Sequence, residues 1–200
     1  MIVVAATQNR NKIIELDAIT RNFGFKIRSL SEVGFSDFKV EEDGKTFKEN
    51  SLKKAMEIHK ASGMVTIADD SGLMVESLNG APGVYSSRFA GEEGNDAKNN
   101  KKLLQMLSGL PMKERGAKFV SVITMVFSEK DIIVARGECK GHILIEPRGK
   151  SGFGYDPLFL PKGYNLSFAE LSADEKNRIS HRAKALEVLK LQLEQRRGNV

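Results

Sequence analysis

The 200-residue chain contains a single cysteine, Cys139, and no long apolar run. One thiol excludes an internal disulfide framework and is typical of a reducing compartment. No segment approaches the roughly 20 apolar residues that cross a bilayer, and no basic region precedes the short apolar stretch at the N-terminus. We therefore expect a cytoplasmic protein that has no signal peptide and no membrane partner.

The chain also lacks internal repeats, low-complexity segments and an obvious linker, which predicts one domain over residues 1–200. Hydrophobic residues make up 40% of the chain and charged residues 28%, as is ordinary for a globular protein. The net charge of +5 weakly favours an anionic partner. Helical patterns alternate with apolar runs, and a β-hairpin is expected at residues 117–127 and 131–145, so we predict an α/β fold with a mixed sheet.

Two adjacent aspartates, Asp69 and Asp70, follow an apolar run at residues 65–68 that is typical of a buried strand. We expect the sequence Asp-Asp-Ser-Gly at residues 69–72 to end this strand. Successive side chains of an extended chain point to opposite faces, so one aspartate can serve chemistry while the other serves structure. Carboxylates at such a position suit Mg²⁺. The alternative is that both are turn formers whose side chains bond nearby amides.

The loop at residues 7–12 joins a strand expected at residues 2–6 to a helix expected from about residue 11. Such a loop points free backbone amides and the positive end of the helix dipole outward, which suits a phosphate. Thr7 and Asn9 add hydrogen-bonding groups, and Lys12 adds a positive charge. The alternative is that Thr7 or Asn9 merely caps the helix.

Three consecutive acids, residues 41–43, precede a second helix that we expect to run to about residue 62. Thr46 and Glu49 form the signature of a capping box at its start. The simplest interpretation of the acids is that they stabilise the helix dipole. Lys53 and Lys54 on this helix are interpreted as solvated charges.

A glycine-rich loop at residues 146–157 contains two aromatic residues, Phe153 and Tyr155. A flat base that stacks on one of these rings gains about 1–3 kcal/mol in a dry site. The alternative is that the rings fill the core beneath the loop.

Three basic residues follow a predicted capping box at residues 172–175. Lys176, His181 and Arg182 do not share one face of an unbroken helix, because each residue turns the helix by about 100°. If they serve one ligand, the helix must break near Ser180. Each is otherwise a solvated charge.

Five separated motifs, spread over nearly the whole chain, agree in order with one family. They are Thr7-x-Asn9-x-x-Lys12, Glu41-Glu42-x-Gly44-x-Thr46-Phe47-x-Glu49-Asn50, Ala68-Asp69-Asp70-Ser71-Gly72, Phe153-Gly154-Tyr155-Asp156-Pro157 and Ser180-His181-Arg182. Together they resemble the inosine triphosphate pyrophosphatase family, the non-canonical purine nucleoside triphosphate pyrophosphatases.

The resemblance implies hydrolysis of ITP, dITP and XTP to the monophosphate and pyrophosphate, which removes these triphosphates from the nucleotide pool. It implies a requirement for Mg²⁺ and an elongated α/β fold with flanking helices and two lobes around a central active-site cleft. It also implies a homodimer that binds a purine nucleoside triphosphate as its substrate and does not bind nucleic acid.

Carried over by motif, the metal and catalytic roles fall on acidic residues. Asp70 is the general base and binds Mg²⁺ together with Glu41 or Glu42, whose register stays open. Residues 7–12 hold the triphosphate, Ser71 contacts substrate, Phe153 stacks on the purine, and the later polar residues read the base. The full substrate-binding set is Thr7, Gln8, Asn9, Arg10, Asn11, Lys12, Ser71, Phe153, Gly154, Tyr155, Asp156, Lys176, His181 and Arg182.

Hypoxanthine and xanthine present an oxygen acceptor at position 6, where adenine presents an amino donor. Donors such as His181 and Arg182 would satisfy that oxygen and reject ATP, although guanine shares the oxygen and this argument does not exclude GTP. Two other hypotheses are a nucleic-acid-binding protein, which a pI near 9.2 favours, and a pyrophosphatase with another base preference.

Overall fold

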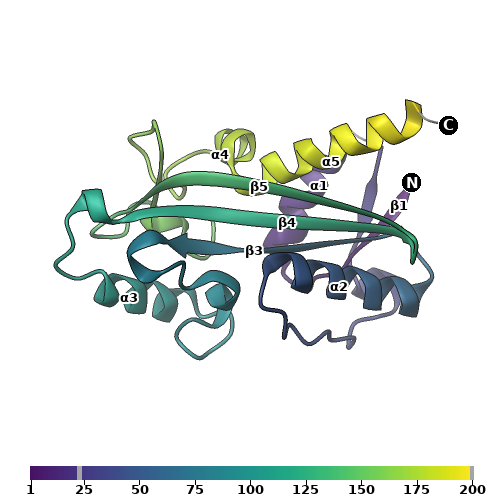
Figure 1. The fold of residues 1–200 in the computed structure, drawn as a ribbon, viewed down its shortest axis with the longest axis horizontal. Helices are drawn as coiled ribbons and strands as arrows, with labels where there is room; N and C mark the ends of the chain where they lie inside the picture. The colour runs from purple at the N-terminus through teal and green to yellow at the C-terminus, as the bar shows by residue number, and fades with distance from the viewer. Residues whose placement is uncertain (22–23, 199–200) are drawn as a thin grey trace. The chain divides into compact units, whose positions relative to one another are not determined.

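The computed structural model describes residues 1–21 and 24–198. Its strands form a six-stranded sheet with the order β2-β1-β3-β4-β5-β6 (Figure 1). The strands are β1 Ile2–Ala5, β2 Lys26–Arg28, β3 Thr66–Val75, β4 Gly116–Ser128, β5 Asp131–Ile143 and β6 Phe159–Pro161. The α-helices are α1 Arg10–Thr20, α2 Phe47–Ser62, α3 Asp96–Met106, α4 Ala173–Ile179 and α5 His181–Gly198. Short 3₁₀ helices are η2 Ser31–Val33, η3 Glu76–Leu78, η4 Gly83–Arg88, η5 Met112–Glu114 and η6 Asp156–Leu158.

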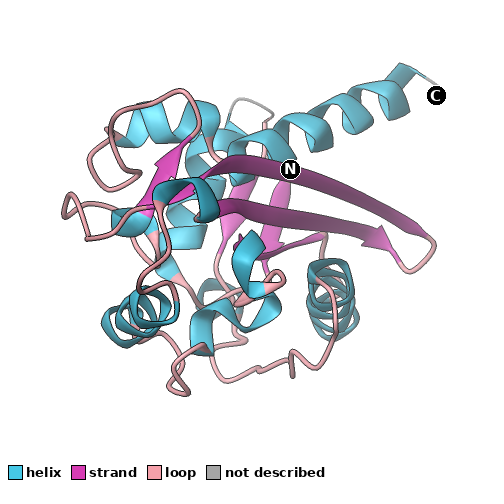
Figure 2. Cartoon of the chain, turned by 60° about the vertical axis from the view of Figure 1, so that its left-hand side comes forward, coloured by secondary structure: helices cyan, strands magenta, loops and turns pink. Residues whose placement is uncertain are grey.

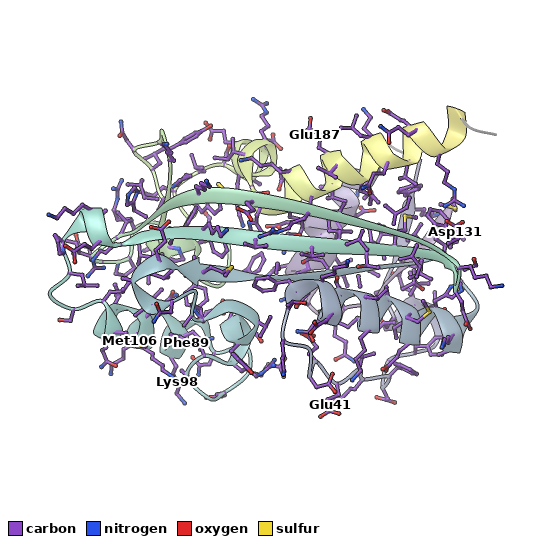
Figure 3. The ribbon with its side chains drawn as sticks, in the orientation of Figure 1. Glu41, Phe89, Lys98, Met106, Asp131 and Glu187 are labelled. Carbon is purple, nitrogen blue, oxygen red and sulfur yellow. The ribbon has the colours of Figure 1, made fainter. Side chains whose placement is uncertain are left out.

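The sheet is mixed, as the sequence predicts. Strand β1 pairs in parallel with both β2 and β3, whereas β5 and β6 are antiparallel. Strands β4 and β5 are neighbours joined by two residues, and such a short connection makes an antiparallel hairpin (Figure 2). Asp131 is labelled at its turn in Figure 3. The expected α/β class, with helices flanking a mixed sheet, is therefore confirmed.

The chain divides into two compact units. Unit 1 comprises residues 1–70, 121–137 and 182–200, and unit 2 comprises residues 71–120 and 138–181. The divisions fall within β3, β4 and β5 and directly after His181, the first residue of α5. The prediction of a single domain over residues 1–200 stays a prediction.

Unit 1 buries both faces of its strands. On one face, Val3, Ala5 and Ile67 pack with Leu16 of α1 and Leu186 of α5. On the other face, the alternate residues Val4 and Ala68 pack with Ala55 and Ile58 of α2. This alternation follows from the two-residue period of a strand. Residue 69 therefore shares the face of α1 and α5, and residue 70 shares the face of α2.

Unit 2 has its own apolar core. Leu73 of β3, Leu103 of α3 and Phe159 of β6 belong to one buried cluster. Phe119 contacts Phe159 edge-on, with ring centroids 4.8 Å apart, and stacks on Phe168 at 5.8 Å. These contacts connect β4 to β6 and to the segment that follows β6, and Tyr155, the residue before η6, is buried in the same cluster.

Most expected helices are confirmed, with small shifts at their ends. Thr46 caps α2, which ends at Ser62, and Ser172 and Glu175 form the expected capping box of α4. A break near Ser180 was expected only if the three basic residues serve one ligand. The break is present, because Ser180 adopts an extended backbone (φ −65°, ψ 157°) between α4 and α5. Across the described residues, no helix has the length and apolar character that a membrane crossing requires.

The expected end of the central strand at residues 69–72 is wrong. Strand β3 continues without interruption from Thr66 to Val75, and Asp69 and Asp70 lie in its interior. Their turn tendency is overridden because the strand lies between β1 and β4 and both carboxylates find cationic partners on their own faces.

Candidate functional site

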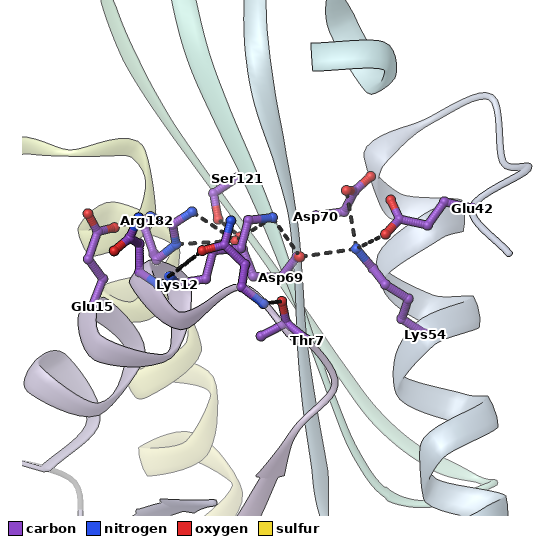
Figure 4. A network of polar contacts seen from close by, with 11 residues as sticks. Thr7, Lys12, Glu15, Glu42, Lys54, Asp69, Asp70, Ser121 and Arg182 are labelled. Carbon is purple, nitrogen blue, oxygen red and sulfur yellow. Dashed lines mark hydrogen bonds and ion pairs between the residues drawn. The ribbon is translucent and has the colours of Figure 1, made fainter. Parts of the chain in front are cut away.

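Asp69 is fully buried in unit 1 and is held by three other residues (Figure 4). Arg182 donates to Asp69 Oδ2 from Nη2 at 2.9 Å and from Nε at 3.2 Å, and Ser121 Oγ donates to Oδ1 at 2.6 Å. Lys12 Nζ lies 3.3 Å from Oδ2. Burial opposes the charged form, but Arg182 and Lys12 outweigh it and hold the pKa of Asp69 well below its usual range. Asp69 is thus an ionised structural anchor.

Arg182 is itself almost completely buried, with 1% of its surface exposed. Besides Asp69, its guanidinium donates from Nη1 to the Glu15 carboxylate of α1. The two acids raise the pKa of Arg182 against the effect of burial. The sequence assigns Arg182 to the base, whereas in unit 1 its donors hold two carboxylates.

The loop at residues 7–12 is organised around Asn9. Its side-chain oxygen accepts hydrogen bonds from the amides of Asn11 and Lys12, at 3.0 and 3.2 Å, so Asn9 caps α1. Thr7 Oγ1 accepts from the Asn9 amide at 3.1 Å. The capping interpretation is therefore confirmed for Asn9. A pocket of about 480 Å³ lies beside the loop in unit 1, and its polar lining includes Thr7, Gln8, Arg10, Ser29, Ser31 and Ser36.

Asp70 faces α2, on the opposite side of β3 from Asp69. Lys54 Nζ lies 3.3 Å from Asp70 Oδ1 and 3.1 Å from Glu42 Oε1, and it donates to the Asp69 carbonyl at 3.2 Å (Figure 4). Burial raises the pKa of Asp70 above its usual value, and Lys54 offsets only part of this effect. Two carboxylates therefore share one buried ammonium, which leaves an excess of negative charge.

The donor set around Asp70 fits a hard divalent cation. Asp70 Oδ2 is buried and has no hydrogen-bond partner among the described residues. Mg²⁺ commonly takes one or two carboxylates and completes its shell with waters and substrate phosphates. Within the described part of the chain, no three His, Cys, Asp or Glu side chains form a closed metal site. An open site of two carboxylates is the arrangement that Asp70 and Glu42 offer.

The two candidate glutamates differ in their surroundings. Glu42 is partly buried and contacts Lys54, whereas Glu41 is exposed and lies on the outer side of the loop before α2 (Figure 3). Glu42 is therefore the one of the two whose carboxylate shares a partner with Asp70. The metal assignment itself stays a prediction.

In unit 2, the loop at residues 153–156 is part of a second cluster of polar contacts. Lys176 Nζ lies 2.7 Å from Asp156 Oδ2, and both side chains are buried. The same Oδ2 accepts a hydrogen bond from the Phe153 amide at 2.9 Å. The Lys176 ammonium lies 4.9 Å from the centroid of the Phe153 ring, which is partly exposed. The predicted base-binding residues Phe153, Asp156 and Lys176 are thus brought together.

Tyr155, His181 and Ser71 belong to the same predicted substrate-binding set. Tyr155 is buried in the core of unit 2, and its hydroxyl donates to the Ser86 carbonyl at 2.9 Å. This position fits the alternative that the ring fills the core, and it leaves Phe153 as the partly exposed ring. His181 is buried and stacks on Phe119 with centroids 4.8 Å apart. Ser71 is partly buried in β3.

The interpretation of Lys54 as a solvated charge is wrong, because 7% of its surface is exposed. A signal for this was present in the sequence. Lys54 lies seven residues after Phe47 and four before Ile58, so it falls on the apolar stripe of α2. Lys53, one position away, is more exposed and pairs with Asp43, as expected of a surface lysine.

The chain matches one protein family over most of its length. The model of the Ham1 family matches residues 3–192. A dITP/XTP pyrophosphatase of Clostridium perfringens is 51% identical and a second, of Haemophilus influenzae, is 49% identical. The alignments cover 94% of each chain for the first, and 96% of this chain and 98% of the relative for the second.

Solved structures agree with the sequence relatives. The Staphylococcus aureus Ham1 protein is 39% identical with a TM-score of 0.86, and the alignment covers 98% of this chain and 100% of that one. A HAM1 protein from Coxiella burnetii is 41% identical with a TM-score of 0.87, over 98% and 99% of the two chains.

Proposed function

The chain belongs to the Ham1 family and is a hydrolase of non-canonical purine nucleoside triphosphates, and we propose that it cleaves ITP, dITP and XTP with Mg²⁺ at Asp70. The family match supports hydrolysis of non-canonical purine nucleoside triphosphates, as do the names of relatives that are about half identical over nearly the full chain. We propose further that the reaction removes these triphosphates from the nucleotide pool, in the cytoplasm, and that the enzyme is a homodimer.

The metal assignment rests on one oxygen of the Asp70 carboxylate, Oδ2. Asp70 Oδ2 is buried without a hydrogen-bond partner among the described residues, and a carboxylate oxygen left in that state is costly unless a cation takes it. Asp70 and Glu42 would hold Mg²⁺, with Glu41 outside the site. When bound, Mg²⁺ supplies charge stabilisation on phosphate oxygens and lowers the pKa of coordinated water.

The residues of unit 1 account for phosphate binding and proton transfer. Lys12 and the polar loop at residues 7–12 would bind the triphosphate, and the neighbouring pocket has room for a chain of phosphates. A water molecule would attack the α-phosphorus as the bond to the bridging oxygen of pyrophosphate breaks. Asp70 would accept the proton of that water, a role that its carboxylate can take beside Lys54 and Glu42.

The residues of unit 2 account for recognition of the base. The purine would stack on the partly exposed Phe153 ring, while Lys176 and His181 would donate to the oxygen at position 6. Arg182 would not contact the base directly, because its guanidinium already donates to Asp69 and Glu15 in unit 1. Its role would be to hold Asp69 in place.

The test measures pyrophosphate release from ITP, XTP, ATP and GTP with Mg²⁺. We expect rapid release from ITP and XTP and its loss in Asp70→Asn, with the fold intact by circular dichroism. Absence of release from every triphosphate would overturn the proposed function.

Mg²⁺ binding to the free protein, measured by calorimetry, separates the two glutamates. We expect Glu42→Gln to weaken binding at least tenfold and Glu41→Gln, the matched control one residue away, to change it less than twofold. Equal effects of the two variants would refute the assignment of Glu42.

A further inference from the structure

We propose that the first two turns of α3 position the base-binding loop, through Asp96 and Asn100, and so determine how Phe153 meets the purine. This inference rests on the proposed function, because it takes Phe153 as the stacking residue. Neither residue belongs to the motifs that the sequence singled out, and both lie in unit 2 with the loop they hold.

Both backbone groups of a single loop residue, Gly154, are held by α3. The Gly154 amide donates to Asp96 Oδ2 at 2.6 Å, and the Gly154 carbonyl accepts from Asn100 Nδ2 at 2.9 Å. Asp96 and Asn100 are four residues apart, so they lie on the same face of the helix. Gly154 adopts a positive φ of 62°, a conformation that side chains disfavour. The helix thus holds the two consecutive peptides on either side of Gly154, one bond to each.

The rest of the loop is held from other directions. The Phe153 amide donates to Asp156 Oδ2, and the Tyr155 hydroxyl donates to the Ser86 carbonyl. Together with the two bonds from α3, these contacts restrict every peptide from 153 to 155. A ring held in this way loses little freedom when a base stacks on it, so less of the stacking energy is lost.

The two bonds from α3 to Gly154 are not the main contacts of this helix with the rest of unit 2. Leu103 and Leu107 are buried in the core, and Asn99 accepts from the Ala90 amide at 2.7 Å and donates to the Ser87 carbonyl at 3.1 Å. Asn95 caps the helix by accepting from the Lys98 amide. Because the helix has its own cap and core contacts, loss of the Gly154 bonds should free the loop more than the helix.

The experiment compares Asp96→Ala and Asn100→Leu, which remove one bond each, with Asp96→Asn, which keeps an acceptor. Lys98→Ala is the matched control, since Lys98 is exposed on α3 and its ammonium pairs with the exposed Glu92 (Figure 3). We measure kcat and KM for ITP, the ratio of kcat/KM between ITP and ATP, and the melting temperature.

We expect the KM for ITP to rise about five- to tenfold for each lost bond, as the loss of one hydrogen bond predicts, with kcat changed less than twofold. The preference for ITP over ATP should fall in parallel. Asp96→Asn should recover most of the wild-type KM, and Lys98→Ala should match the wild type. A lower melting temperature with unchanged KM and unchanged preference would overturn the proposal, because it would show a purely structural role.

A readout without substrate separates this proposal from the proposed function. Hydrogen exchange at the Gly154 amide, followed by NMR, should accelerate at least tenfold in Asp96→Ala and stay unchanged in Lys98→Ala. If the wild type hydrolyses no triphosphate, the proposed function fails whatever the exchange rates are. If the wild type hydrolyses ITP and Gly154 exchanges equally fast in all variants, the positioning role fails instead.

Discussion

Replacement of Arg182 by methionine should destabilise the protein strongly, because it leaves a buried carboxylate with too little positive charge. Asp69 would keep the hydroxyl of Ser121 at 2.6 Å and the ammonium of Lys12 at 3.3 Å, but it would lose both bonds from the guanidinium. Glu15 would lose the same guanidinium. Removing one member of a buried pair costs about 3–5 kcal/mol.

For a chain of this size, each kcal/mol lowers the melting temperature by about 2–4 °C, so Arg182→Met should lower it by about 6–20 °C. Differential scanning calorimetry of the free protein measures the effect. The matched control is Arg21→Met, because Arg21 pairs with Asp17 in the same unit but is 73% exposed, and an exposed pair contributes less than about 1 kcal/mol.

A second variant tests the cause. In the Arg182→Met background, Asp69→Asn removes the uncompensated charge and should restore part of the lost stability. If Arg182→Met costs no more than Arg21→Met, then Arg182 does not serve as the counterion of Asp69, and its assignment to the base regains support.

Two further substitutions test local features of the site. Tyr155→Phe leaves the Ser86 carbonyl without its donor, so we expect a loss of about 1–3 kcal/mol in urea unfolding; unchanged stability would contradict the core position of the ring. In Gly44→Ala, the new Cβ would lie 2.5 Å from Asn50 Oδ1 and 2.8 Å from Glu49 Cβ, so the loop carrying Glu42 must shift. We expect calorimetry to show weaker Mg²⁺ binding, and unchanged binding would speak against Glu42 as a ligand.

The positions of helix ends could be predicted from the sequence because their causes are local. Thr46 caps α2 through the amide of Glu49, three residues away, and Ser172 and Glu175 cap α4 reciprocally. The break at Ser180 was expected only if Lys176, His181 and Arg182 serve one ligand, because no single helix face accommodates all three. Each of these features depends on atoms within about one helical turn along the chain.

The alternation of strand faces was predictable in the same way, but the length of the central strand was not. That Asp69 and Asp70 point in opposite directions follows from the period of an extended chain. That the strand continues past them follows from Arg182 and Ser121, whose places beside β3 no local pattern indicates.

The sequence by itself determined the fold class, the helix caps and the five motifs of the family, because neighbouring residues carry that information. Only the tertiary structure decided which charges are buried and with whom. Arg182 meets Asp69 across 113 positions of the chain, and Asp96 meets Gly154 across 58. The cost of burying a charge depends on the partners that folding brings to it, and residues so far apart in sequence become partners only when the sheet and its helices are assembled.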